Sequence, residues 1–145
     1  MKRFRYSLET LLSLRREREQ ECEIELSIAM SELLNIENRI ESALNAGDRA
    51  FLVACMNVND MLARENLWLK SINDRKALEK PRTEAAHRVE NARIHYQDAH
   101  SQRIALEKIR DKRLGQWRKK VKREEINRLD ETSNSASMRQ RLWGW

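Results

Sequence analysis

Apolar residues recur at alternating steps of four and three along the first third of the chain. They fall at Cys22, Leu26, Ala29, Leu33, Ile36, Ile40 and Ala43, and polar or charged residues fill most positions between them. This heptad pattern is typical of a helix that buries one narrow stripe against a partner helix. The hydroxyl of Ser7 can cap the start of such a helix. Upstream, the stripe is expected to continue through Phe4, Leu8 and Leu11.

A turn is predicted where the first stripe ends. Gly47 can adopt the left-handed conformation that closes a helix, and Asp48 can cap the next one. Residues 50–57 form a short apolar stretch, and residues 48–57 are expected to be a short helix or helical loop. Two asparagines and Asp60 then provide capping groups, so the last helix is expected to start near Asp60. The alternative is one helix running straight through from Asp48.

Helical spacing returns after the turn and continues toward the C-terminus. Before Pro81 the apolar positions are Met61, Trp68, Ile72 and Leu78. Pro81 lacks a backbone donor and crowds the preceding turn, so it should kink or break the helix. Beyond it, small and apolar residues allow close helix approach, with Arg103 as an interruption, at Ala85, Val89, Ala92, Tyr96, Ala99 and Leu106. The predicted fold is all-α.

The pattern predicts a long antiparallel two-helix coiled coil, a hairpin over residues 1–131 with a short helical connection near 48–58. The first arm of about 40 residues would be about 60 Å long. The returning arm is longer, so its surplus should overhang or stay disordered. Residues 132–145 include the polar run TSNSAS and are expected to form a flexible polar and basic tail. Trp143 and Trp145 in this tail are either a docking motif or part of a mobile end.

The segment from Arg103 to Arg128 is basic and helix-forming. It holds eleven Lys or Arg residues against four acidic ones. Its apolar residues form a thin seam that cannot support a globular core, at Ile104, Ile109, Leu114, Trp117 and Val121. Because such a seam needs a partner helix, the segment favours a binding protein over an enzyme.

Composition supports this interpretation. Of the 145 residues, 36% are charged, and the chain has one Pro and three Gly. Long helices fit this composition better than a packed globule with a deep pocket, so we expect no catalytic residues, no cofactor and no small-molecule substrate. The net charge of +6 implies an acidic protein surface, a nucleic acid or a membrane as partner. Single-stranded nucleic acid binders add several stacking aromatics, and only Trp117 lies within the basic segment, so nucleic acid is the less favoured partner.

The remaining sequence features point to a reducing cytoplasm. Cys22 and Cys55 do not form a metal or redox motif, and are expected to be small buried hydrophobes. The basic, leucine-rich start is interrupted by Glu9 and lacks a cleavage site, so secretion is not expected. The longest uncharged run, residues 50–59, is too short to span a membrane.

No metal site is predicted. Glu84 and His87 have the spacing of half a carboxylate-bridged site, but no second copy of that pair exists. His95 and His100 lie nearby, yet the three histidines do not share one helix face. They are interpreted as solvated surface residues.

Two segments resemble the flagellar export protein FliJ family, soluble components of the flagellar type III export apparatus. The first is Phe4 to Arg15, a basic and aromatic entry into a leucine-rich turn. The second contains Leu106 to Arg113, then Trp117, Glu124 and Leu129-Asp130-Glu131. The resemblance implies an antiparallel coiled coil, similar to the stalk subunit of rotary ATPases, that binds the hexameric export ATPase, the membrane export gate protein and export chaperones. It also implies a cytoplasmic protein peripherally associated with the inner-membrane apparatus.

The resemblance implies two contact regions. An acidic ring lumen should accept the basic end of the coiled coil, for which the candidate residues are Arg110, Arg113, Trp117, Arg118, Lys119 and Lys122. The gate contact of the family maps to Trp68 and Ile72, although Arg75 and Glu79 depart from the residues expected next to them. Three alternatives remain: the equivalent stalk protein of a virulence type III system, a basic nucleic-acid binder, and a structural coiled-coil homodimer.

Overall fold

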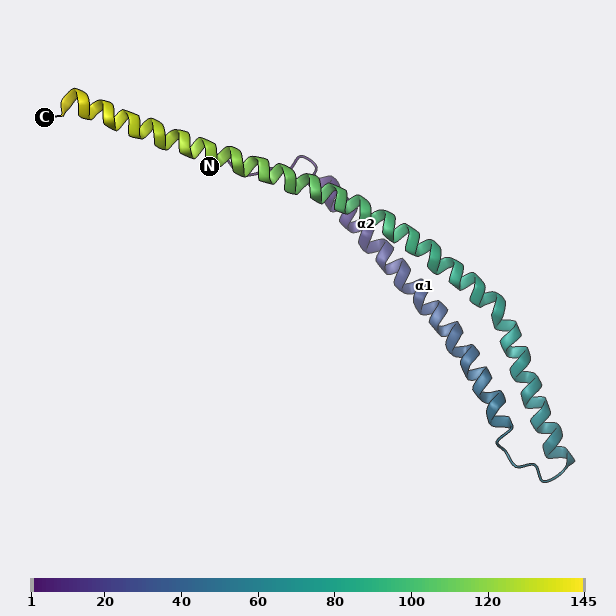
Figure 1. Ribbon diagram of the computed structural model, residues 1–145. Helices are drawn as coiled ribbons and strands as arrows, with labels where there is room; N and C mark the ends of the chain where they lie inside the picture. Colours follow the sequence, from purple (N-terminus) through teal and green to yellow (C-terminus); the bar gives the residue numbers. More distant parts are fainter. Residues whose placement is uncertain (1, 145) are drawn as a thin grey trace. The chain divides into compact units, whose positions relative to one another are not determined.

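The computed structural model describes residues 2–144 and consists of two helices (Figure 1). Helix α1 (Glu9–Ala50) has 42 residues, and helix α2 (Val58–Trp143) has 86. A non-helical loop over residues 51–57 joins them. No strand occurs within residues 2–144, so the all-α prediction is confirmed.

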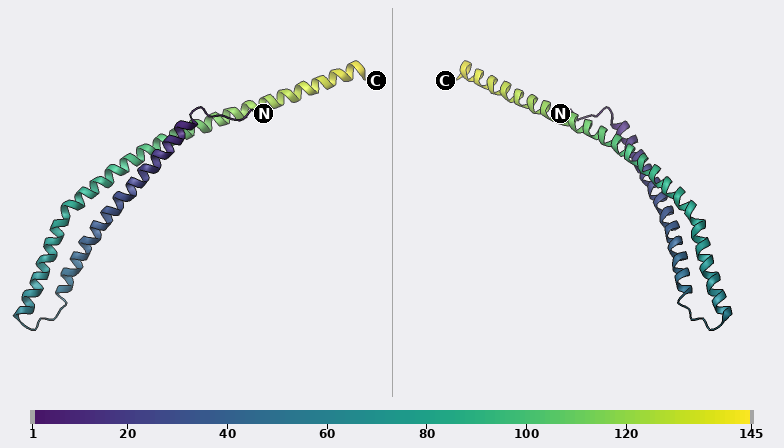
Figure 2. Two further views of the ribbon diagram at one scale, coloured as in Figure 1. Left: turned by 180° about the vertical axis from the view of Figure 1, so that it is seen from behind. Right: turned by 45° about the vertical axis from the view of Figure 1, so that its right-hand side comes forward.

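The contacts divide into two compact units. One comprises the residues up to Arg16 together with those from Ser101 onward, and the other spans Glu17–His100. In the second unit, Glu37, Glu32 and Glu19 of α1 face Arg82, Arg88 and His100 of α2 in that order. The residue number therefore falls on α1 as it rises on α2, and the two helices run antiparallel, as Figure 2 shows from two further directions. The predicted helical hairpin is confirmed.

The core of the unit 17–100 is the predicted seam. Ala29, Val89 and Ala92 form its buried cluster, with Leu26 and Leu33 packed against them. The other predicted α1 positions, from Ile36 to Ala43, are all at least half-buried. Because most α2 core residues are alanines, the two helices can approach closely, and little apolar volume lies between them.

The first turns of α1 lie in the other unit, and here the predicted seam is wrong by one residue. Leu12 is 0% exposed, whereas the expected Leu11 is 38% exposed. Continuing the heptad backward from Cys22 gives Glu19, Arg15, Leu12 and Leu8, which are the positions that lie inward. Because two of these positions hold polar side chains, a search for apolar residues alone does not find the heptad register here.

Gly47 does not end α1, contrary to the prediction. It lies inside the helix, has no left-handed backbone, and is buried against α2. The Ser71 hydroxyl donates a hydrogen bond of 2.7 Å to the Ala43 carbonyl one turn earlier. A Cβ atom on Gly47 would lie 2.5 Å from Ser71 Oγ, so the glycine is required for close approach between helices.

The connection also differs from the expected short helix. Helix α1 ends in a tightened turn, in which Phe51 and Leu52 donate to the carbonyls of Asp48 and Arg49. The following apolar side chains are exposed, so no packing favours helix there. Asn57 caps α2: its Oδ1 accepts a 2.8 Å hydrogen bond from the Asp60 backbone amide. The capping role of this residue was predicted, and α2 begins two residues before Asp60.

Pro81 lies inside α2 without interrupting it. The helix changes direction within its teal stretch, around residues 75–85, as Figure 1 shows. A missing backbone donor and ring crowding explain a kink at this position. The prediction of a kink or break is thus resolved as a kink.

Residues 132–143, expected as a flexible tail, continue α2 as helix. Every residue from 122 to 144 is exposed. Helix formation here therefore relies on intrinsic propensity and local hydrogen bonds, such as that from Thr132 Oγ1 to the Arg128 carbonyl (2.9 Å). The mobility of this segment in solution stays a prediction. Trp145 lies outside the described residues.

The two cysteines occupy different environments. Cys22 is 1% exposed in the α1 seam, as predicted for a small buried hydrophobe. For Cys55 the same prediction is wrong: it lies partly exposed in the loop, with its sulfur 3.8 Å from the Val53 carbonyl oxygen.

Candidate partner-binding surfaces

The N-terminal residues pack onto the basic stretch of α2. Tyr6 is buried and donates a 3.1 Å hydrogen bond from its hydroxyl to the Leu106 carbonyl. The Phe4 and Trp117 rings meet at 5.7 Å between centroids. The guanidinium carbon of Arg113 lies 5.6 Å from the centre of the Tyr6 ring, within the range of a cation–π interaction. Aromatic contacts therefore fix the beginning of the chain on one side of this α2 segment.

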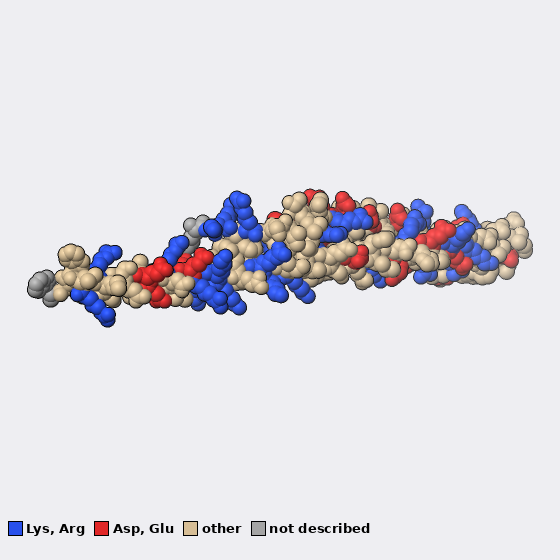
Figure 3. Space-filling model, turned by 90° about the horizontal axis from the view of Figure 1, so that it is seen from above, with Lys and Arg blue, Asp and Glu red and all other residues tan. Residues whose placement is uncertain are grey.

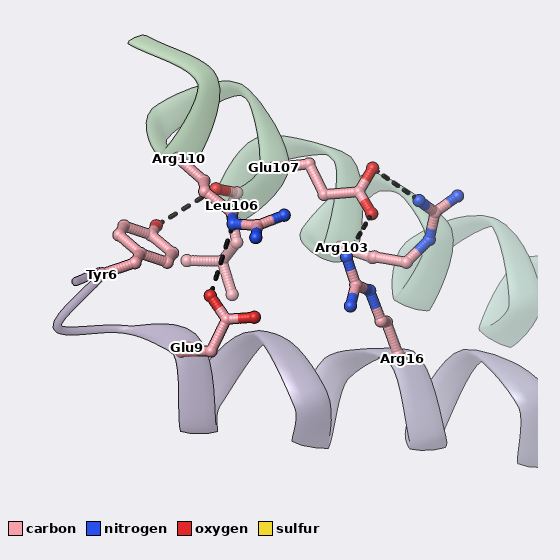
Figure 4. A network of polar contacts seen from close by, with 7 residues as sticks. All are labelled: Tyr6, Glu9, Arg16, Arg103, Leu106, Glu107 and Arg110. Carbon is pink, nitrogen blue, oxygen red and sulfur yellow. Dashed lines mark hydrogen bonds and ion pairs between the residues drawn. The ribbon is translucent and has the colours of Figure 1, made fainter. Parts of the chain in front are cut away.

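Polar contacts reinforce the same packing (Figure 4). Glu107 accepts hydrogen bonds from Arg103 of its own helix (2.7 Å) and Arg16 of α1 (3.3 Å). These contacts, chiefly the one from Arg103, lower the pKa of the Glu107 carboxyl below its ordinary value of 4.5. Arg110 Nε lies 3.3 Å from Glu9 Oε2 in an ion pair that lacks hydrogen-bond geometry. The half-buried Arg103, which interrupts the apolar seam, is thus neutralised where it lies.

The structure divides the six residues predicted for the ATPase contact into two sets. Arg110, Arg113 and Trp117 make intramolecular contacts with the N-terminal part of the chain. The other three are exposed and form no ion pair with another described residue: Arg118, Lys119 and Lys122. In the first set, Arg110 is paired with the Glu9 carboxylate, whereas Arg113 contacts the neutral Ser7 hydroxyl and the Tyr6 ring. The ATPase contact of all six residues stays a prediction.

The free cations lie where α1 no longer covers α2. Figure 3 shows Lys and Arg standing out from the single-helix part of the molecule, beside a patch of Asp and Glu. The sequence explains this zoning, because five cations between residues 118 and 123 precede the acidic residues Glu124 and Glu125. Toward the C-terminus of this segment, the positively charged surface is followed within about one helical turn by a negatively charged one.

The predicted gate contact lies in the other unit, near the loop. Trp68 is 40% exposed, and its ring meets the Phe51 ring edge-on at 6.2 Å. Ile72 is half-buried on the next turn. Met61, expected in the seam, is exposed, and Arg64 takes the inward position with its guanidinium carbon 5.3 Å from the centre of the Phe51 ring. Trp68 and Ile72 are therefore near each other and partly available to a partner.

The histidines show no metal-binding arrangement. Within residues 2–144, no three His, Cys, Asp or Glu side chains are grouped to hold an ion. His100 instead contacts the Glu19 carboxylate at 3.0 Å and stacks against Tyr96. Neither helix, over the described residues, contains a stretch long and apolar enough to cross a bilayer.

Comparison with known protein families shows to which family the chain is related. Residues 4–142 of the 145 match the family described as Flagellar FliJ protein. The chain belongs to the flagellar FliJ family. Searches of curated proteins and of solved structures found no significant match.

FliJ membership makes this a flagellar export-associated coiled-coil protein, in a family of non-enzymatic components. The match extends over both helices and includes the basic stretch and residues 132–142. Tyr6 is the important residue that reasoning from periodicity missed. The alternation of basic and aromatic residues in Arg3-Phe4-Arg5-Tyr6 was the available signal.

Proposed function

We propose that this FliJ-family chain acts as a stalk that binds the hexameric export ATPase and the export gate, and promotes ATPase assembly and protein export. Family membership and the uncompensated cations of α2 support the proposal. The protein would act in the cytoplasm, next to the membrane apparatus, without catalysing a reaction itself. Export chaperones are further expected partners. The family match favours a flagellar system over a virulence system.

The exposed cations carry the proposal for the ATPase contact. Arg118, Lys119 and Lys122 lie on an uncovered helix, where long-range attraction to an acidic ring lumen is not offset by internal ion pairs. The aromatic and polar contacts around Tyr6 hold the adjoining α2 segment to the residues that precede α1, so the charges are presented by a supported helix. Binding through exposed charges should weaken as salt screens them.

The test measures the activity of the cognate export ATPase with added stalk protein. Unmodified protein should raise the ATPase rate and the hexamer fraction. A charge-reversed variant should lose most of this effect; it combines R118E, K119E and K122E. A matched control makes the same charge change at exposed lysines of the other unit: K70E, K76E and K80E. Equal loss in both variants, or no stimulation by the unmodified protein at saturation, would count against the proposal.

The gate contact is tested separately. Trp68→Ala should reduce binding to the soluble domain of the gate protein, because it removes a large, partly exposed aromatic anchor. Ile94→Ala, which truncates an exposed residue elsewhere on α2, is the control. Unchanged gate binding by Trp68→Ala would remove this residue from the proposed site while leaving the ATPase contact intact.

A further inference from the structure

The outward face of α1 carries a second regular stripe that the proposed function does not use. Its positions alternate by four and three, and none of them is charged: Ile24, Ile28, Ser31, Asn35, Asn38, Ser42 and Asn45. All seven are exposed, and each lies two residues, about 200° of helix rotation, beyond a residue of the buried seam. We call them the outer stripe. Its first part, at Ile24, Ile28 and Ser31, borders a groove lined by α1 residues, whereas Asn35, Asn38 and Ser42 border a groove that α2 also lines.

The outward face of a two-helix coiled coil is usually charged, because water is its only neighbour. On the equivalent face of α2, two residues beyond its inward positions, Lys80 and Asp98 interrupt a series that also includes Asn91 and Ile94. The outer stripe of α1 breaks the rule for about 33 Å. The stripe repeats with the heptad spacing at which one helix contacts another, with two apolar and five uncharged polar residues at the contact positions.

The surface along the outer stripe is hollowed. One shallow groove is lined by Ile24, Ser27, Ile28 and Ser31, with Glu23 and Glu32 at its sides. A second groove lies between the two helices. It is lined by Asn35, Asn38, Arg39 and Ser42 of α1 and by Asp74, Ala77 and Leu78 of α2, among others. Small serine side chains at the centre leave room for larger residues of a partner. The two isoleucines are 60% and 56% exposed and supply its apolar anchors.

Charge identifies the kind of partner. From Glu19 to Asp48, α1 has eight acidic residues and one basic residue, Arg39, although the whole chain has a net charge of +6. Glu32 pairs with Arg88, but Glu23 and Glu41, which border the outer stripe, are exposed and form no ion pair with another described residue. Acidic borders repel nucleic acids and anionic lipids, and attract a helix bordered by Lys or Arg.

We propose that the outer stripe binds a helix of another protein, with small or apolar contact residues and basic flanking residues. Asn35 and Asn38 would set its register, because a buried amide is stable only opposite a hydrogen-bonding group. Polar contact positions also weaken the interface, so the complex should be reversible. This surface is separate from the residues assigned to the ATPase and the gate.

The binding test uses two synthetic helical peptides of about 28 residues, four heptads long. They share the same Ala, Leu and Asn contact residues, and differ only in carrying Lys or Glu at the flanking positions. Fluorescence anisotropy with the full-length chain should show the Lys peptide binding at least about tenfold more tightly. If neither peptide binds, or if both bind equally, the proposal is wrong.

Three variants locate the binding. Ile28→Lys should weaken binding of the Lys peptide at least about tenfold, because it places a cation in the centre of the outer stripe. Ile94→Lys makes the same change at an isoleucine of similar exposure (54%) on α2 and should have no effect. The double variant E23K and E41K should reverse the preference in favour of the Glu peptide. Equal loss in Ile28→Lys and Ile94→Lys would contradict the assignment.

Self-association is the competing occupant of the outer stripe. Sedimentation of the chain alone over a range of concentrations measures it. A dimer that Ile28→Lys abolishes and Ile94→Lys retains would overturn the proposal of a basic partner and assign the stripe to a second copy. Stimulation of the export ATPase by Ile28→Lys should equal that of the unmodified chain, which separates this proposal from the stalk function.

Discussion

The substitution Gly47→Ala measures how closely the two helices approach in the unit 17–100. In an open helix this change is favourable, because alanine exceeds glycine in helix propensity by about 1 kcal/mol. Here the new methyl group would lie 2.5 Å from Ser71 Oγ and 3.0 Å from its Cβ. Serine is too short to swing away without losing its hydrogen bond to the Ala43 carbonyl.

Whether Gly47→Ala raises or lowers the free energy of unfolding depends on three contributions: the lost hydrogen bond, the overpacking and the gain in helix propensity. Losing that hydrogen bond costs about 1 kcal/mol, and overpacking at a tight contact costs about 1–3 kcal/mol. After subtraction of the propensity gain, Gly47→Ala should lower the free energy of unfolding by about 1–3 kcal/mol. Urea unfolding followed by far-UV circular dichroism gives this quantity, provided that a second probe shows the same transition.

Two comparisons make the test specific. Gly115→Ala should raise the free energy of unfolding by up to about 1 kcal/mol, since nothing lies within 4 Å of the position that its new methyl group would take. In a Ser71→Gly background the clash is absent, so Gly47→Ala should become stabilising. If Gly47→Ala stabilises the unmodified chain, the close approach described for Gly47 and Ser71 is wrong.

Three further substitutions test other contacts. Glu107→Gln should destabilise the fold by at most about 1 kcal/mol at pH 7, given partial exposure. Because the folded-state pKa is lowered, this stabilisation is complete above about pH 4.5 and is lost as pH falls through the lowered value, so the difference in urea unfolding should shrink as pH is lowered stepwise below 4.5. Trp117→Ala removes the ring that Phe4 contacts, and should cost about 1 kcal/mol and speed tryptic cleavage near the N-terminus; unchanged cleavage would contradict that packing. Asn57→Ala should cost about 1 kcal/mol through loss of the α2 cap, whereas Asn59→Ala should be nearly neutral in the same thermal melt.

Heptad periodicity was enough to predict the helices, their antiparallel pairing and most of the seam from Cys22 to Ala43. It failed where a seam position is polar. Glu19 and Arg15 occupy inward positions, and the resulting gap led to Leu11 in place of Leu12. Such side chains are tolerated because α2 supplies polar partners, His100 for Glu19 and Gln102 for Arg15, and that information is tertiary.

Glycine was the other source of error. Gly47 was interpreted through its backbone freedom, although its role is to lack a side chain beside Ser71. The candidate ATPase site was predicted as a set of cations, but sequence alone could not separate Arg110 and Arg113, which contact the N-terminal residues, from the free Arg118. Which cations remain available to a partner depends on the intramolecular contacts of the folded chain.

Because Cys22 is buried and Cys55 is partly exposed, chemical labelling of the two thiols can report the separation of α1 from α2 in the native chain. An alkylating reagent should modify the loop thiol rapidly, with a stoichiometry of one. The Cys22 thiol should react only when α1 and α2 separate around it, so its labelling rate reports how often that separation occurs. A partner that binds along the coiled coil would lower the labelling rate of Cys22, so its binding could be followed without any engineered probe.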